Sequence, residues 1–194
     1  MFKWVLDPVG DFLLRLGFAP NTMTLLGLAG TALGGFFLAK GAMTLGGILV
    51  LIMGPVDALD GTMARLRGEP SDFGAFVDSV TDRYSELIIY AGLLYYYASI
   101  ENQIGGLLAF AAASGSVLVS YVKARAEGLG FEARIGILTR AERYIILGPS
   151  LLVNQLLIGL GLIALLAHAT AFQRIWHVRS QGHARMAANS ERQK

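Results

Sequence analysis

Residues 57–65 read Asp-Ala-Leu-Asp-Gly-Thr-Met-Ala-Arg, and Gly74, Asp78 and Asp82 follow them. This stretch places four carboxylates and an arginine in segments that are otherwise apolar enough to lie in a membrane. An ionised group in hydrocarbon is costly, so it persists there only when it is paired, hydrated or bound to a cation. The stretch therefore indicates an ion site inside a membrane protein.

Composition supports a membrane protein. Of the 194 residues, 54% are hydrophobic and 15% are charged, whereas a soluble domain carries about a quarter charged residues. The net charge of +2 is too small to suggest a nucleic-acid partner. The absence of cysteine excludes a disulfide scaffold and thiolate metal ligands.

Apolar runs of about 20 residues predict membrane-spanning helices. Four such runs lie at residues 22–39, 43–66, 72–99 and 104–127. A turn is expected at 68–71, with Ser71 as the N-cap of the following helix, and a polar loop is expected at 128–139. Residues 1–19 show helical spacing of apolar side chains, which predicts an amphipathic helix at the membrane interface or, alternatively, an ordinary surface helix.

The uncharged run 144–167 leaves two possibilities, one tilted helix or two shorter helices that break near Asn154 and Gln155. Hydropathy slightly favours one helix, but the loop charges favour two. With alternating spans, one side of the membrane receives most of the basic loop residues, which are Arg15, Arg65, Arg67, Lys123, Arg125, Arg134, Arg140 and Arg143. The positive-inside rule makes that side cytoplasmic, and the basic tail must return to it.

The charge pattern therefore predicts an all-α integral membrane protein with six transmembrane helices and an N-terminal interfacial helix. We expect residues 20–180 to form one domain in the cytoplasmic membrane, with its active site facing the cytoplasm. We expect the polar tail 181–194 to be disordered.

The aspartates form two pairs, each on one helix face, because Asp57 and Asp60 are three residues apart and Asp78 and Asp82 are four apart. The pairs lie at similar distances from the turn, so an antiparallel hairpin brings them to similar depth. Oxygen ligands without a thiolate or a nearby histidine favour Mg²⁺ or Mn²⁺, with room for two ions. A buried ion-pair network is the structural alternative, with the acids paired to Arg65, Arg67 and Arg83.

The pattern D-x2-D-G-x2-A-R-x8-G-x3-D-x3-D resembles the signature of the CDP-alcohol phosphotransferases, and this chain matches every fixed position. The resemblance implies six transmembrane helices, a homodimer, and transfer of a substituted phosphate from a CDP-linked donor to an alcohol with release of CMP. It also implies that Asp57, Asp60, Asp78 and Asp82 hold two divalent ions, and that Asp82 is the general base.

The same resemblance implies a donor site. Residues 20–24 are similar to the start of the family's first helix, where Asn21 would cap the helix and leave backbone N–H groups free for a phosphate; an ordinary N-cap fits equally well. The expected donor-binding residues are Asn21, Thr22, Met23, Asp57, Gly61, Arg65, Ser71 and Gly74.

Residues 120–127 and 140–143 resemble the subfamily that makes phosphatidylinositol phosphate, or its archaeal lipid counterpart, from inositol 1-phosphate. The resemblance implies that the acceptor's phosphate is bound by Ser120, Lys123, Arg143 and Arg174, with Arg179 as the alternative to Arg174. Three cations beside a metal site suit a phosphorylated acceptor. The expected donor is CDP-diacylglycerol.

Two other functions remain open at this point. Phosphatidylglycerol phosphate synthesis also uses a phosphorylated acceptor, glycerol 3-phosphate. A divalent-cation channel or transporter would explain the carboxylates, but it would not explain Gly61, Arg65 and Gly74.

Overall fold

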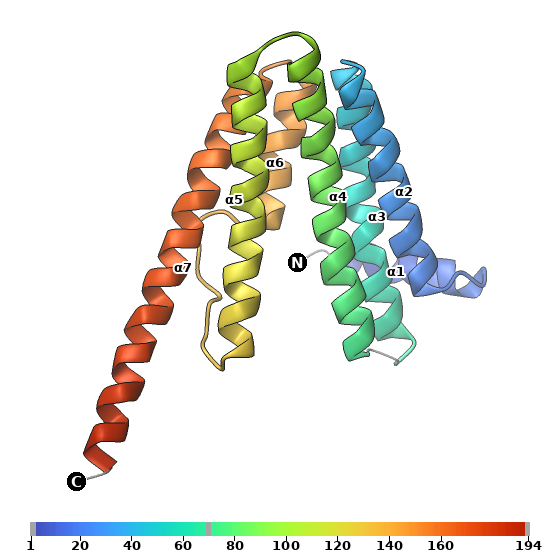
Figure 1. The fold of residues 1–194 in the computed structure, drawn as a ribbon. Coiled ribbons are helices and arrows are strands. Elements are labelled where there is room, and N and C mark those ends of the chain that lie inside the picture. The colour runs from blue at the N-terminus through green and yellow to red at the C-terminus, as the bar shows by residue number, and fades with distance from the viewer. Residues whose placement is uncertain (1–2, 69–70, 193–194) are drawn as a thin grey trace.

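The structure is a computed structural model that describes residues 3–68 and 71–192. These ranges form seven helices and no strand, which confirms the all-helical prediction (Figure 1). The helices are α1 (Lys3–Arg15), α2 (Pro20–Ala39), α3 (Met43–Leu66), α4 (Asp72–Ser99), α5 (Gln103–Gly128), α6 (Arg140–Leu152) and α7 (Leu156–Arg192).

Helix α3 joins the two halves of the molecule. It packs against α2 on one side and against α6 on the other, while α4 packs against α2 and α5, and α7 packs against α5 and α6. Figure 1 shows α2, α3 and α4 side by side, with α5, α6 and α7 forming the other flank. Helix α1 lies across the lower part of this arrangement and packs against α3. The charged motif at the C-terminal end of α3 therefore faces helices from both flanks.

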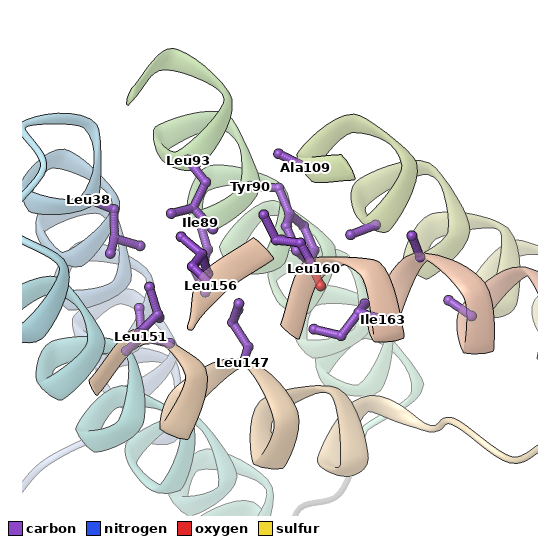
Figure 2. Packing of buried hydrophobic residues seen from close by; sticks show 14 of the residues in the cluster. Leu38, Ile89, Tyr90, Leu93, Ala109, Leu147, Leu151, Leu156, Leu160 and Ile163 are labelled. Carbon is purple, nitrogen blue, oxygen red and sulfur yellow. The ribbon is translucent and has the colours of Figure 1, made fainter. Parts of the chain in front are cut away.

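An apolar core occupies the part of the bundle away from the α3–α4 turn (Figure 2). Leu38 of α2, Leu93 of α4 and Leu160 of α7 are fully buried in it. Small residues permit this packing, since a Cβ added at Gly35 of α2 would lie 3.0 Å from the carbonyl oxygen of Ile88 in α4. In lipid the hydrophobic effect does not drive helices together, so their association depends on close van der Waals packing of this kind. This core fixes the helices whose other ends carry the site.

The breaks between the helices lie where the sequence predicts them. Helix α3 ends at Leu66, and α4 begins at Asp72 with the Ser71 hydroxyl accepting a hydrogen bond from the Gly74 N–H at 3.0 Å. The run 144–167 is two helices, as the charge argument requires. The chain leaves α6 after Leu152 and reverses at Asn154, whose φ of 55° lies in the left-handed region.

Four of the described helices are long and apolar enough to cross a membrane: α2, α3, α5 and α7. Helix α4 has 28 residues, but its charged side chains, including Asp78, Asp82 and Glu86, lower its hydropathy. Helix α6 has 13 residues, a length of about 20 Å against a hydrocarbon core of about 30 Å. The finer prediction of six spans therefore rests on the loop charges.

The structure differs from the expected disorder of the tail, because α7 continues through Arg192. Its exposed end is held by the 129–139 loop. The Gln181 amide both accepts a hydrogen bond from the Glu132 N–H and donates one to the Glu132 carbonyl. Arg185 donates to the Gly130 carbonyl at 2.6 Å, and its guanidinium lies 4.2 Å from the Phe131 ring centroid. Polar composition alone did not show these contacts.

Candidate active site

Three aspartates converge where α3 and α4 face each other. Asp57, Asp60 and Asp78 each offer a carboxylate oxygen, and these atoms lie within 4.8 Å of one another. Asp57 and Asp60 are each only 5% exposed. The Oδ1 atom of Asp57 is buried and has no hydrogen-bond partner among the described residues. An all-oxygen donor set with an unsatisfied buried carboxylate oxygen fits Mg²⁺ or Mn²⁺.

Helix α2 holds one of these carboxylates in place. The Thr24 hydroxyl donates to Oδ2 of Asp60 at 2.5 Å, and the Gly61 N–H donates to Oδ1 at 2.5 Å. Both oxygens of Asp60 are thus oriented by the protein. Thr24 was not among the predicted site residues, although it lies in the 20–24 motif and carries a hydroxyl that can reach a carboxylate.

Asp82 lies one turn beyond Asp78 and joins the cluster through an arginine. Arg140 of α6 places Nη2 2.6 Å from Oδ2 of Asp57, and its Nη1 pairs with Oδ1 of Asp82. Arg83 lies 3.4 Å from the other oxygen of Asp82. Sequence analysis counted Arg140 only among the cytoplasmic basic residues, because nothing in the spacing showed that α6 would reach the aspartates.

The described residues form only a small part of the ion-pair network that the sequence offered as the alternative. Of Arg65, Arg67 and Arg83, only Arg83 pairs with one of the four acids in the described part of the chain, and Arg65 instead pairs with Asp7 at 3.2 Å. The cluster thus keeps an excess of negative charge, which a cation would balance.

The start of α6 is fixed by a capping box. The Thr139 N–H donates to Oε2 of Glu142 at 2.7 Å, and the Thr139 hydroxyl donates to the same oxygen. Contacts of this kind between the N-cap residue and the third helical residue define the first turn of a helix. Arg140 and Arg143 both lie in this turn, so the cap fixes the backbone positions from which the two guanidinium groups extend.

A cavity of about 460 Å³ opens beside the aspartates. Three predicted donor-binding residues line it, Gly61, Ser71 and Gly74, together with the carboxylates of Asp60 and Asp78. A Cβ added at Gly61 would meet nothing within 4 Å, so the backbone there is open to a ligand. The remaining lining residues are Ala19, Pro20, Thr24, Ala64, Arg67 and Ala75.

Other predicted donor contacts lie elsewhere. Thr22 is exposed and Met23 is buried, and neither lines the cavity. Arg65 points to Asp7 and Thr62, whereas Arg67, which was not predicted, lines the cavity.

The expected capping role of Asn21 is wrong. Helix α2 begins at Pro20 and its N-cap is Ala19, because proline is well suited to the first helical position. The Asn21 side chain lies outside the described part of the structure.

The predicted acceptor residues come from three helices. Arg143 of α6 and Arg174 of α7 are 2% and 5% exposed. On α5, the Lys123 ammonium is half-exposed and lies 4.0 Å from Glu127, while the Ser120 hydroxyl donates to the Ser116 carbonyl. Arg143, Arg174 and Lys123, on three different helices, are together called the basic region.

The structure distinguishes Arg174 from Arg179. Arg174 donates to the carbonyl oxygens of Ile135 at 2.8 Å and Val119 at 2.6 Å. Arg179 is exposed, and its guanidinium lies 5.3 Å from the Trp176 ring centroid. Of the two, Arg174 is therefore the buried arginine that contacts the interior of the bundle.

Arg143 has a partner that the sequence did not indicate. Its Nε donates to Oε1 of Glu86 at 2.5 Å, and its Nη2 donates to Oε2 at 3.0 Å. Glu86 lies on α4, one turn beyond Asp82, directly before an apolar stretch. Its helical spacing from Asp78 and Asp82 was the one available signal.

The chain is similar to several known proteins. Phosphatidylinositol phosphate synthase of Streptomyces avermitilis is 40% identical over 149 residues, which cover 75% of this chain and 61% of that protein. Archaetidylinositol phosphate synthase of Pyrococcus horikoshii is 36% identical over 185 residues, covering 92% of this chain and 93% of that one.

A crystal structure of Mycobacterium tuberculosis phosphatidylinositol phosphate synthase with CDP-DAG bound superposes with a TM-score of 0.84 at 31% identity, covering 90% of this chain and 93% of that one. Another crystal structure of that enzyme, in complex with manganese and citrate, gives a TM-score of 0.83. Residues 18–176 match the family described as CDP-alcohol phosphatidyltransferase. With this fold and aspartate site, the chain belongs to the CDP-alcohol phosphatidyltransferase family of membrane enzymes.

Proposed function

We propose that this enzyme transfers the phosphatidyl group of CDP-diacylglycerol to inositol 1-phosphate, giving phosphatidylinositol phosphate and CMP. One observation carries the proposal. Arg140 and Arg143 lie in the same turn of α6, and Arg140 contacts the aspartates while Arg143 lies in the basic region. An acidic site suited to metal ions and a buried arginine suited to a phosphate thus lie within one turn of α6.

The metal ligands in this proposal are Asp57, Asp60, Asp78 and Asp82, which would hold Mg²⁺ or Mn²⁺, with two ions expected. When bound, the ions would neutralise the donor pyrophosphate and the leaving phosphate of CMP. The manganese complex of the Mycobacterium tuberculosis enzyme supports this choice.

The chain's own groups supply the rest of the reaction. The donor's CDP portion would occupy the cavity at Gly61, Ser71 and Gly74, where open backbone permits a close approach. Asp82 would accept the proton of the acceptor hydroxyl as that oxygen bonds to the phosphorus carrying the diacylglycerol. The bond from that phosphorus to the CMP oxygen breaks, and CMP leaves with the electron pair.

The acceptor assignment rests on charge and on the relatives. Two buried arginines and Lys123, balanced by Glu86 and Glu127, leave one excess positive charge that suits a phosphate. Both named relatives make inositol phosphate lipids. Archaetidylinositol phosphate synthesis differs in the lipid chains alone, and phosphatidylglycerol phosphate synthesis is the alternative with another acceptor.

The proposed setting is the cytoplasmic membrane. In this proposal α4 and α6 join the four apolar helices as spans, so that six helices place the active site on the cytoplasmic side. A homodimer is the proposed assembly. The cytoplasmic orientation follows from the basic loops.

The test is CMP release by the purified protein with CDP-diacylglycerol and Mg²⁺, offered inositol 1-phosphate or glycerol 3-phosphate in parallel. Turnover with inositol 1-phosphate is the expected result. A strong preference for glycerol 3-phosphate would overturn the acceptor assignment and leave the metal site intact.

Lys123→Ala is expected to raise the KM for inositol 1-phosphate about 10-fold, because a charged hydrogen bond contributes about 1.5–3 kcal/mol. The KM for CDP-diacylglycerol should stay unchanged. Lys40→Ala, at the opposite end of the bundle, is the matched control. If the donor KM rose instead, Lys123 would belong to the donor site. Steady-state kinetics with each substrate varied in turn decides this.

A further inference from the structure

Glu86 is a buried acid that the reaction as described does not use. It is 4% exposed and lies among apolar residues of α4, one turn from Asp82. Its carboxylate meets Arg143, which is itself 2% exposed, in a two-pronged ion pair. A buried ion pair is seldom more stabilising than well-packed apolar residues of the same volume. Stability alone is therefore a weak reason for this pair.

The geometry of the pair fixes the arginine. Because the guanidinium is planar, bonds from Nε and Nη2 to the two oxygens of one carboxylate set its plane and its direction. The remaining nitrogen, Nη1, is buried and has no hydrogen-bond partner among the described residues. One edge of Arg143 is thus held by Glu86, and the other nitrogen is left to bind something else.

The local charge indicates what that ligand is. Arg174 is buried as well, and its own contacts are to backbone carbonyls, which carry no full charge. Glu86 balances one of the two guanidinium charges, so one positive charge remains in a region of low solvent access. An anion with several acceptor oxygens would satisfy both the charge and the unpaired Nη1.

We propose that Glu86 is a positioning residue of the acceptor site, which orients Arg143 so that Nη1 binds the phosphate of the acceptor. The inference rests on the proposed function for the identity of the acceptor. Glu86 does not touch the substrate in this scheme and acts through Arg143. It also balances the charge of Arg143, which lets this arginine remain buried.

The experiment compares Glu86→Gln and Glu86→Asp with the wild type, using Glu101→Gln as the matched control. Glu101 is exposed in the turn between α4 and α5, far from the site. Glu86→Gln should raise the acceptor KM about 10-fold or more, as expected for loss of an oriented charged hydrogen bond, and change the donor KM less than about twofold. Glu86→Asp, which keeps the charge, should lie between the wild type and Glu86→Gln.

A second measurement does not depend on turnover. Titration calorimetry with inorganic phosphate should show weaker binding to Glu86→Gln than to the wild type and to Glu101→Gln. A merely structural role would lower the yield of active protein and kcat, and leave both the acceptor KM and phosphate binding unchanged. That result, or absence of phosphate binding to the wild type, would overturn the proposal. If Glu86→Gln fails to fold, Glu86→Asp alone decides by the same two measures.

The two proposals fail in different ways. Turnover of the wild type with glycerol 3-phosphate but not with inositol 1-phosphate would refute the proposed function. The effect of Glu86 would then be measured on the KM for glycerol 3-phosphate. Normal wild-type turnover with inositol 1-phosphate, together with an unchanged acceptor KM in both Glu86 variants, would refute the positioning role alone.

Discussion

Asp78→Asn is expected to lower CMP release by about a thousandfold, because loss of a metal ligand removes several kcal/mol of charge stabilisation. The carboxylate of Asp78 lies within 4.8 Å of those of Asp57 and Asp60 but makes no ion pair with Arg140. The substitution therefore removes a ligand without breaking the contact between α6 and the site. Electron paramagnetic resonance should show weaker Mn²⁺ binding, and a CMP assay gives the rate.

Asp72→Asn is the control for this experiment. Asp72 lies on the same helix but is exposed in its first turn, outside the three-carboxylate group. The Asp72→Asn variant should bind Mn²⁺ and release CMP as the wild type does. Wild-type Mn²⁺ affinity in Asp78→Asn would mean that the aspartate group is not the metal site.

Asp82→Asn is expected to lower kcat by about 10²- to 10⁴-fold, the usual contribution of a general base. The amide has nearly the same shape as the carboxylate and keeps an oxygen that can accept from Arg140. It cannot take the proton of the acceptor hydroxyl. Donor binding should remain measurable, so the change should fall on kcat and not on the KM for CDP-diacylglycerol.

The comparison for Asp82→Asn is Asp11→Asn, which breaks an exposed ion pair with Arg15 on α1. Exposed pairs contribute little to stability, so this variant should retain wild-type rates. Full kcat in Asp82→Asn would refute its assignment as the base. A parallel loss of Mn²⁺ binding would show that part of the effect comes from the second proposed role of Asp82, as a metal ligand.

Local patterns predicted much of the fold. Helical spacing and an N-cap at Ser71 located the α3–α4 hairpin, and the hairpin brought Asp57, Asp60 and Asp78 together. Loop charges predicted the break near Asn154, where hydropathy alone favoured a single helix. These features depend on residues that are close together in the sequence, or on the number of basic residues in each loop.

The parts that sequence analysis missed depend on contacts between distant segments. Arg140 is 83 residues from Asp57, and Arg143 is 57 residues from Glu86. The spacing of residues within one helix does not show which side chains of another helix will contact it. The same reason explains the tail, whose order comes from the contacts of Gln181 and Arg185 with the 129–139 loop.

The length of α7 has a consequence for how the two substrates reach the enzyme. Its 37 residues extend about 55 Å, whereas the hydrocarbon core is about 30 Å thick. At the lower left of Figure 1, the last turns of α7 extend past the 129–139 loop. In the proposed orientation these turns would stand in water. The lipid donor would diffuse within the bilayer. The soluble acceptor would reach the site from the water, passing the projecting C-terminal end of α7. The reaction would then take place at the boundary between the two phases.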